Sequence, residues 1–441
     1  TSSINTFRHY PKGFCFDSAG LSIFGDKEDL TFLLGFLNTK VCTSILSVFN
    51  PTLNASPGVI KRLPYIECDD KLIFDIVNRS ISISKEEWDA HEYSWNFKVN
   101  ELIRIKGQDI IDIEEAYLLF EQYWKNKFSQ LHRNEENLNK RFIDIYEMAD
   151  EMSPSVPFEN ITILKEEISF EKNDLTFKSN EVFKQFISYA VGCMFGRYSL
   201  DKEGLILANQ GETLQDYIYK IDKSPNEISF LPDEDDIIPI LDDEWFEDDI
   251  VGKFYRFLKV TFGEKNFSKN IAFIEEQIGK DIRKYFAKDF YPDHIKRYKK
   301  RPIYWMFSSP KGSFNVLIYM HRYTPDTVSN ILNKYLKEFI GKLNARKEHL
   351  QHIQVTGSAS EKTKAIKEIN NIDKMLVELH EYERDILYPL ATERIEIDLD
   401  DGVLVNYNKF GRAVKEVNGL NDPATKKKVK QFDWIDTSQI K

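Results

Sequence analysis

The residues best suited to recognise a charged ligand form a basic and aromatic stretch from His294 to Trp305. Five unit charges fall within six residues, on Lys296, Arg297, Lys299, Lys300 and Arg301. Lysine and arginine contact phosphates, and a guanidinium group can also read guanine bidentately in the major groove. The stretch therefore predicts contact with nucleic acid through at least two of these cations. The alternative is a surface loop entering a buried strand, with Tyr304 and Trp305 as core residues, and core is the preferred assignment for these two rings.

A second candidate is the pair Arg197 and Tyr198, which ends an apolar helix and follows Gly192 and Gly196. Such a placement can aim the arginine into a cleft. An arginine at the C-terminal end of a helix also stabilises the helix dipole, and this account is equally good. Both interpretations stay open for Arg197.

Two further groups of polar residues lie near the start of the chain. Lys61 and Arg62 precede a buried-looking Leu-Pro pair and could contact phosphate. Asn38, Asn50 and Asn54 could contact the DNA backbone or bases. Asparagine near proline and in turns, however, is first of all a turn or cap residue.

No catalytic or metal-ligating set emerges from the remaining polar residues. The segment 233–249 holds 10 acidic residues in 17, but its spacing fits no metal loop and Trp245 and Phe246 are embedded in it. We expect a structural or partner-facing segment. There is no HExxH motif, and His349 and His352 lie in a helix rich in Lys, Arg and Gln. The four cysteines are far apart, which favours reduced core thiols in the cytoplasm.

Charge is distributed unevenly along the 441 residues. The net charge is −11, yet residues 251–346 carry 20 Lys and Arg against 8 Asp and Glu, a net of +12, which leaves −23 on the rest. A basic region of domain size inside an acidic protein is typical of a surface that binds a polyanion. The alternative is a solvated basic face paired with the acidic segment.

The composition bounds the class of protein. A chain of this length can form two or three domains, and 42% hydrophobic residues indicate a globular fold. Its apolar runs are far shorter than the roughly 20 residues that span a bilayer, so no membrane partner is expected. The chain begins Thr-Ser-Ser-Ile without Met, so we expect further sequence upstream.

Periodicity predicts a helix-rich α+β fold with several domains. Apolar stripes predict helices at 27–48, 112–148, 181–195, 250–262 and 270–288, and strands are expected at 160–164 and 303–307. A capping box formed by Ser84 and Glu87 predicts a helix start at Lys85. Helices opened by Thr324-Pro325 and by residue 360 should form an antiparallel α-hairpin.

Domain boundaries follow from these elements. We expect an N-terminal segment at 1–83, a helical connector at 84–152, a mixed α/β domain at 153–323, the α-hairpin at 324–388 and a tail at 389–441. The run Lys426-Lys427-Lys428-Val429-Lys430 in the tail is most simply a solvated charge cluster.

Several motifs, in order along nearly the whole chain, resemble a known family. The stretch 32–40 (FLLGFLNTK) followed by 60–64 (IKRLP) resembles the "LLGLLNSK … LP" element found after the catalytic domain of adenine methyltransferases with a fused target-recognition domain. Further matching segments are 10–14 (YPKGF), 50–54 (NPTLN), 142–146 (FIDIY), 187–198 (ISYAVGCMFGRY), 300–305 (KRPIYW) and 397–403 (IDLDDGV). Together they are similar to the C-terminal half of the BREX phage-defence adenine-specific methyltransferases of the PglX family.

This resemblance implies a parent enzyme that uses S-adenosylmethionine to methylate adenine N6 in double-stranded DNA. The Asn/Asp-Pro-Pro-Tyr/Phe motif and Gly-rich turn such enzymes need are absent, the nearest string being Asn50-Pro51-Thr52. The resemblance thus implies a DNA-recognition region, 153–323 being the target-recognition domain, that contains no cofactor site and partners the methyltransferase domain and other defence proteins. The alternative is a non-catalytic interaction scaffold of a defence complex.

Overall fold

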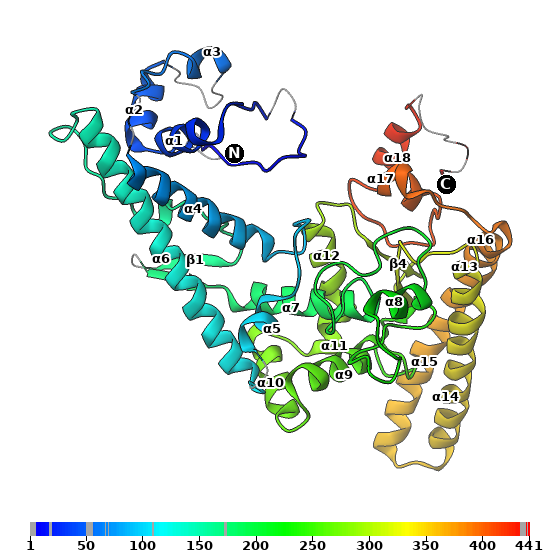
Figure 1. The fold of residues 1–441 in the computed structure, drawn as a ribbon. Helices are drawn as coiled ribbons and strands as arrows, with labels where there is room; N and C mark the ends of the chain where they lie inside the picture. Colours follow the sequence, from blue (N-terminus) through cyan, green and yellow to red (C-terminus); the bar gives the residue numbers. More distant parts are fainter. Residues whose placement is uncertain are drawn as a thin grey trace. The chain divides into compact units, whose positions relative to one another are not determined.

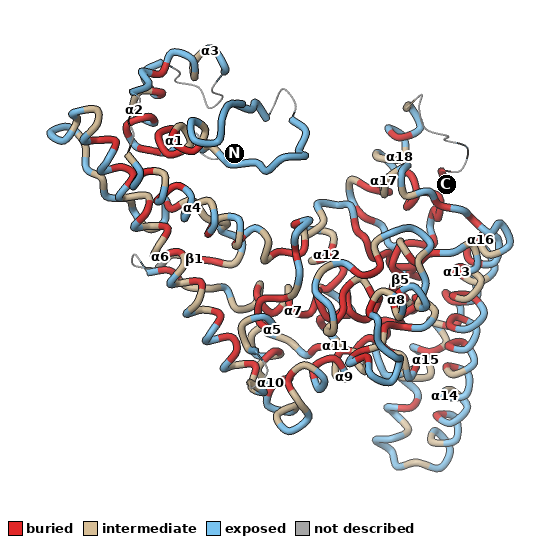
Figure 2. The backbone as a smooth tube through the Cα atoms, in the orientation of Figure 1, coloured by how far each residue is buried: buried red, intermediate tan, exposed pale blue. Residues whose placement is uncertain are grey.

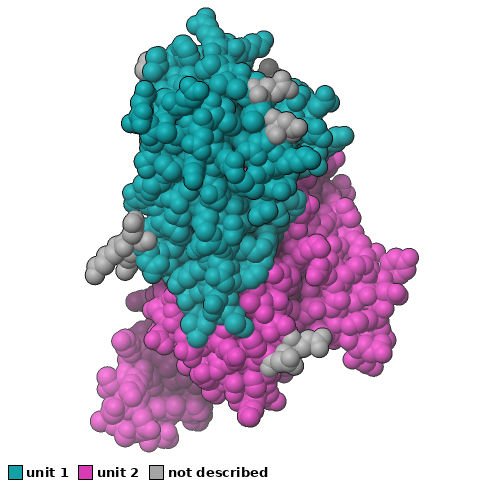
Figure 3. Space-filling view, turned by 60° about the vertical axis from the view of Figure 1, so that its left-hand side comes forward, with its two compact units in different colours: residues 1–94, 117–178 teal, residues 95–116, 179–441 magenta. Residues whose placement is uncertain are grey.

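The computed structural model describes residues 6–16, 20–49, 56–66, 68, 70–107, 110–171, 174–432, 438 and 440–441. The chain divides into two compact units, which Figure 3 distinguishes by colour. Unit 1 consists of residues 1–94 and 117–178, and unit 2 consists of residues 95–116 and 179–441. The chain therefore enters unit 2 for a short stretch, returns to unit 1 and then completes unit 2.

Unit 1 is mainly helical, with one small β-hairpin. Its elements are α1 (Lys27–Leu37), α2 (Lys40–Phe49), α3 (Pro57–Ile60), α4 (Lys71–Asp89), α6 (Ile113–Ile145) from Tyr117 onward, a 3₁₀ turn (Phe158–Asn160), β1 (Ile168–Glu171) and β2 (Asp174–Phe177) (Figure 1). Apolar residues of α1, α2, α4 and α6 form its core, in which Phe36 and Phe142 are fully buried. The predicted long helix is confirmed as α6, whose apolar residues are buried along its length, Leu138, Phe142 and Ile143 in this core.

The predicted helix at 27–48 is wrong as one element, because α1 and α2 meet at an angle of 76°. The break lies at Asn38. Its side-chain oxygen accepts the N–H of Phe7 at 3.0 Å, and its amide donates to the carbonyl of Leu34 at 3.0 Å. An asparagine that bonds backbone groups in this way competes with helix continuation.

The predicted helix start at Lys85 is also wrong. Helix α4 already begins at Lys71, where the Asp70 side chain accepts the N–H of Leu72 at 2.9 Å, and it runs straight through Ser84. The Glu87 carboxylate accepts the N–H of Leu164 at 2.8 Å instead of closing a capping box. The upstream part of α4 buries apolar residues in the core, and such packing outweighs a local capping signal.

Unit 2 surrounds a small antiparallel sheet with helices. Its helices are α5 (Glu101–Lys106), α7 (Ser179–Met194), α8 (Leu214–Ile221), α9 (Ile250–Phe262), α10 (Phe267–Ile278), α11 (Ile282–Tyr285), α12 (Tyr291–Arg297), α13 (Thr327–Asn330), α14 (Lys337–Thr356), α15 (Ala359–Tyr382), α16 (Tyr388–Glu393), α17 (Gly402–Asn408) and α18 (Pro423–Val429). A 3₁₀ turn lies at Leu399–Asp401, and π-helical turns lie at Phe286–Phe290, Ile331–Leu336 and Glu383–Leu387.

The sheet has the order β3 (Ile238–Pro239), β5 (Asn315–Tyr319), β4 (Tyr304–Ser308). Tyr304 pairs with Tyr319, and every residue of β4 is buried (Figure 2). The predicted strand at 303–307 is thereby confirmed. The expected strand at 160–164 is wrong, since the first strand of the chain's described part is β1 at 168–171.

The expected α-hairpin is confirmed by α14 and α15, which pack against each other along their length (Figure 1). Gly357 ends α14, and Ser358 caps α15 in a capping box with Glu361. The predominance of helix with two small antiparallel sheets confirms the α+β class. Within the described ranges, no single helix is long and apolar enough to cross a bilayer, and only the bent pair α1 and α2 passes that test jointly, by length and composition.

Candidate nucleic-acid interface

The basic strip, defined as Lys296, Lys299, Lys300 and Arg301, lies at the C-terminal end of α12 and in the turn that leads into β4. All four residues are exposed, and none of them forms an ion pair with the described part of the chain. The Arg301 guanidinium group donates to the carbonyl of its neighbour Lys300 at 2.9 Å. Arg297 is half-buried and has contacts within the protein. Four of the five predicted cations are therefore available to an external anion.

The backbone of the strip is strained where α12 ends. Lys299 and Lys300 have φ angles of 50° and 63°, in the left-handed region that glycine normally occupies at this point. The N–H of Lys300 donates to the carbonyl of Ile295 at 2.8 Å, which is the closing bond of a Schellman turn. A non-glycine residue in this region costs roughly 1–2 kcal/mol. Strain of this kind is retained mainly where side chains have a role.

His294 holds the turn against the sheet. Its Nε2 accepts the N–H groups of Ile303 at 3.2 Å and Tyr304 at 3.1 Å, so this nitrogen carries no proton. Burial, with a contribution from the charges of Arg297 and Arg197, holds the pKa of His294 well below its usual range. The ring centroid also lies 4.8 Å from that of Tyr304. A neutral histidine thus fixes the basic strip to the start of β4.

Arg197 lies at the end of α7 among hydroxyl groups. Its Nε donates to the Tyr198 hydroxyl at 3.1 Å and its Nη1 to the Tyr319 hydroxyl at 3.2 Å, and the part of the chain that the structure describes offers it no carboxylate. Tyr198 is buried, with an exposed fraction of 1%, so contact between its ring and DNA would require local rearrangement. A Cβ on Gly192 would lie 2.4 Å from the Tyr198 ring, which explains the glycine.

Packed aromatic rings connect the neighbourhood of Arg197 to the basic strip. The Tyr304 ring stacks on Phe195, beside Arg197, and on His294 of α12. Burial and then the charge of Arg197 lower the pKa of His321 to about 4. Arg197 and the basic strip, which are distant in sequence, are therefore linked by these rings in unit 2.

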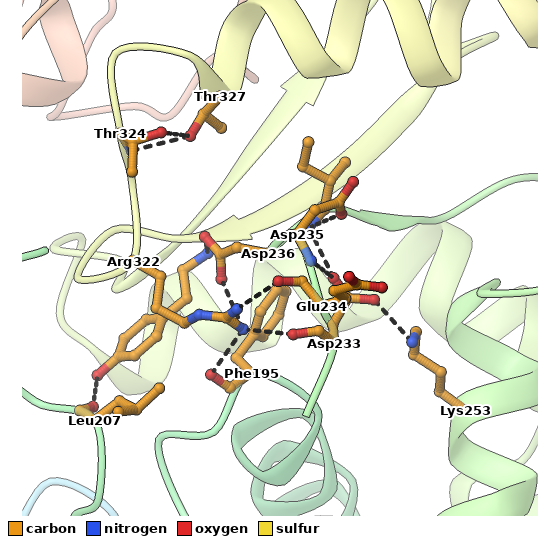
Figure 4. A network of polar contacts seen from close by, with 12 residues as sticks. Phe195, Leu207, Asp233, Glu234, Asp235, Asp236, Lys253, Arg322, Thr324 and Thr327 are labelled. Atoms are coloured by element: carbon orange, nitrogen blue, oxygen red, sulfur yellow. Dashed lines mark hydrogen bonds and ion pairs between the residues drawn. The ribbon is translucent and has the colours of Figure 1, made fainter. Parts of the chain in front are cut away.

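The start of the acidic segment is fixed by a polar network centred on Arg322, in which Asp233 and Asp236 are buried (Figure 4), whereas Asp242, Asp243, Glu244 and Glu247 further along are exposed. Arg322 donates to the carbonyls of Asp233 at 2.8 Å and Glu234 at 3.0 Å, and its Nη1 lies 3.8 Å from Asp236 Oδ1. Burial raises the pKa of Asp236 well above its ordinary value, against the effect of Arg322. Asp233 pairs with Lys253 at 2.8 Å. These contacts give the start of the segment a structural role, which is one of its two expected roles.

The other end of the acidic segment is internal as well. Asp249 caps α9 through the N–H of Val251 at 2.9 Å and pairs with Arg283 at 2.9 Å. Tyr335, in the π-helical turn, donates to Asp248 at 2.8 Å and contacts Asp235 at 3.0 Å. No cluster of three or more His, Cys, Asp or Glu side chains with metal-binding geometry occurs within the ranges that the structure covers.

The candidates of unit 1 are placed as follows. Lys61 and Arg62 are exposed directly after α3, and no ion pair to another described residue holds them. Asn38 uses its side chain in the cap described above, which agrees with the turn or cap alternative. Asn50 and Asn54 lie outside the described residues.

Sequence reasoning missed two features of this region. The core position of His294 was hidden because its partners are backbone N–H groups nine and ten residues away, which no side-chain pattern reveals. Arg322 looked like one basic residue among many, and only its carbonyl partners show its structural role. The acidic run at 233–249, which Arg322 contacts in the fold, was the one sequence signal for this structural role.

The free side chains assembled here can attract and position a polyanion. Phosphate contacts of this kind fix a protein on a duplex without reading sequence, whereas an arginine that reaches a base edge can specify it.

Comparison with known proteins gives a consistent assignment. No family model matches the chain. It is 34% identical over 447 aligned residues to the adenine-specific methyltransferase BrxX of Escherichia coli O9:H4 (strain HS), covering 95% of this chain and 36% of that protein. It is 35% identical over 427 residues to the adenine-specific methyltransferase PglX of Lacticaseibacillus casei (strain Zhang), covering 93% of this chain and 33% of that protein.

The similarity extends along nearly the entire chain, whereas the chain spans only about a third of the length of these two relatives. Identity at this level over more than 400 residues agrees with the family that the ordered motifs indicated. The chain is a homologue of the BREX adenine-specific methyltransferases BrxX and PglX.

Proposed function

We propose that this chain is the DNA-recognition region of an adenine-N6 DNA methyltransferase that acts in phage defence. Its homology to two adenine-specific methyltransferases supports the enzyme class. The observation that carries the DNA contact is the basic strip, whose four exposed cations form no ion pair with any described residue and lie on and beside a strained turn. In this proposal the strip contacts phosphates of double-stranded DNA. Arg197 and, on unit 1, Lys61 and Arg62 are further contact candidates.

The chemistry of methyl transfer belongs, in this proposal, to another part of the parent polypeptide. The chain offers neither the Asn-Pro-Pro-Tyr type motif that grips a flipped adenine nor a Gly-rich turn for S-adenosylmethionine. The methyltransferase domain is therefore a proposed partner, and other defence proteins are further ones. The homology does not favour a purely non-catalytic scaffold.

A salt titration of duplex binding tests the proposal. Lys296, Lys299, Lys300 and Arg301 are replaced together by Ala, and Arg297 is left unchanged because it is half-buried and contacts other residues. If three of the four meet phosphates, the slope of log affinity against log salt becomes shallower by about 2.7, at about 0.9 per phosphate. The strip is exposed, so the fold should survive.

The matched control removes four charges elsewhere in unit 2. Lys362, Lys364, Lys367 and Lys374 lie on α15, and no described residue forms an ion pair with them. Their replacement by Ala should leave the slope unchanged. Equal slopes for the strip variant, the control and the wild type, all folded by circular dichroism, would remove the strip from the DNA surface.

A further inference from the structure

The C-terminal segment of the chain is fixed to the same sheet as the basic strip. The N–H of Ser308 donates to the carbonyl of Ala413 at 2.9 Å, and the N–H of Lys415 donates to that of Met306 at 2.8 Å. Residues 413–415 thereby run along β4, directly beyond the turn that carries the strip. The segment is thus anchored by main-chain bonds to a buried strand.

The segment then passes under the strip. Gly419 has a φ of +83°, and a Cβ built there would lie 3.1 Å from the Lys300 ammonium and 3.2 Å from its Cδ. The side chain of Lys300 therefore extends over the backbone of Gly419. Asp422, which follows, caps α18 by accepting the N–H of Thr425 at 3.1 Å. A larger residue at 419 would displace the lysine.

Helix α18 presents a row of lysines from this anchored position. Val429 is buried at 1% exposure and holds the helix, whereas Lys427, Lys428 and Lys430 are exposed. Upstream, Arg412 and Lys415 are exposed too. None of these five cations forms an ion pair with another residue of the described ranges.

Like charges crowd this surface. Burial lowers the pKa of Lys426, and the charges of Lys430 and Arg412 add to the effect, while Glu416 opposes it. Residues 409–432 contain seven Lys and Arg against two acidic residues. Repulsion between lysines four residues apart, such as Lys426 and Lys430, disfavours a helix, and Glu416 offsets it only for part of this surface, so an external polyanion would stabilise the arrangement.

We infer that α18 and its flank, through Arg412, Lys415, Lys427, Lys428 and Lys430, form a second phosphate-binding element that continues the basic strip across Gly419. The inference rests on the proposed function. The lysines at 426–430, expected to be a solvated charge cluster, then contact phosphates of the duplex backbone instead. Duplex DNA is favoured over an acidic protein because the two basic elements adjoin through Lys300, and a duplex offers charge at about every 1.7 Å along its axis.

The test uses the full chain and a duplex of random sequence, since phosphate contacts do not depend on sequence. Lys427, Lys428 and Lys430 are replaced by Ala in one variant and by Arg in a second. The control replaces Lys364, Lys367 and Lys374 by Ala. Fluorescence anisotropy over a series of salt concentrations gives the slope of log affinity against log salt for each protein.

We expect the alanine variant to flatten the slope by up to about 2.7, at about 0.9 per phosphate, while the arginine variant and the control keep the wild-type slope. A wild-type slope for the folded alanine variant overturns the inference and assigns the surface to an acidic protein partner.

The variant of the basic strip, measured in the same assay, separates the proposed DNA contact of the strip from that of α18. A flattened slope for the strip variant alone retains the proposed function and overturns the inference. A flattened slope for the α18 variant alone retains the inference and overturns the placement of DNA on the strip. Wild-type slopes for both overturn both.

Discussion

At the scale of single residues, the position of the basic strip depends on His294, a side chain that is not itself a proposed DNA contact. His294 is 2% exposed and binds two main-chain N–H groups through Nε2, while its Nδ1 has no partner in the described protein. The basic strip is attached to the sheet through this ring. Protonation of Nε2 would remove both acceptor bonds at once.

The first prediction concerns the pH dependence of stability. Because the pKa of His294 is lowered, the unfolded chain binds a proton and the folded chain does not when pH falls below the ordinary value of about 6.5. The free energy of unfolding should therefore decrease with falling pH, by at most about 1.4 kcal/mol per pH unit from this residue. Urea unfolding of wild type and His294→Gln between neutral and mildly acidic pH measures it.

The variant isolates His294 from the other histidines. His321, with a pKa lowered to about 4, acts in the same direction. At His91, burial lowers the pKa but the contact with Glu167 outweighs it and raises the pKa, so His91 acts in the opposite direction. Both residues are present in wild type and variant, so they cancel in the difference. Parallel pH profiles for the two proteins would contradict a buried neutral His294.

At the scale of elements, the end of α12 combines strain with charge. A Schellman turn normally places glycine where Lys299 lies, and the left-handed φ continues at Lys300. Glycine would be more stable at either position, so the two lysines place positive charge on this turn at a cost in stability.

The second prediction separates these two effects. Lys299→Gly should raise the free energy of unfolding by about 1 kcal/mol, because glycine adopts a positive φ without steric cost. Lys299→Ala should not raise it. Both variants lose the same charge, so both should weaken duplex binding equally. Chemical denaturation and anisotropy measure the two quantities, and an unchanged stability of the glycine variant would argue against strain at this turn.

At the scale of the whole chain, recognition and catalysis are proposed to lie in different parts of a longer polypeptide. The match to about a third of each relative is consistent with this division. Unit 2 carries the basic strip and α18, and unit 1 carries Lys61 and Arg62.

The third prediction follows from the missing methyltransferase motifs. The 441-residue chain should not bind S-adenosylmethionine with micromolar affinity and should not methylate DNA, while it retains salt-dependent duplex binding. Isothermal titration calorimetry and transfer of labelled methyl groups check the first two points. A full-length relative serves as the positive control, and heat from stoichiometric cofactor binding to the chain would refute the prediction.

The sequence by itself indicated the resemblance to adenine-specific methyltransferases, the helix-rich α+β class and the region of positive charge, because motifs, apolar periodicity and charge are properties of local stretches. It also located the strand at 303–307 and the α-hairpin. It failed at Asn38, whose side chain bonds to the distant residue Phe7 and interrupts the helix. It also failed at Ser84, where the burial of upstream residues of α4 outweighed the local capping signal.

Only the tertiary structure decided which cations are free. Of the five cations predicted between Lys296 and Arg301, it set Arg297 apart as half-buried and left the other four in the basic strip, and it placed the Tyr198 ring in the core. It also brought Gly419 beneath Lys300, more than 100 residues away, and so joined the tail to the strip. These relations depend on contacts between segments distant in sequence, and packing fixes them rather than composition or spacing.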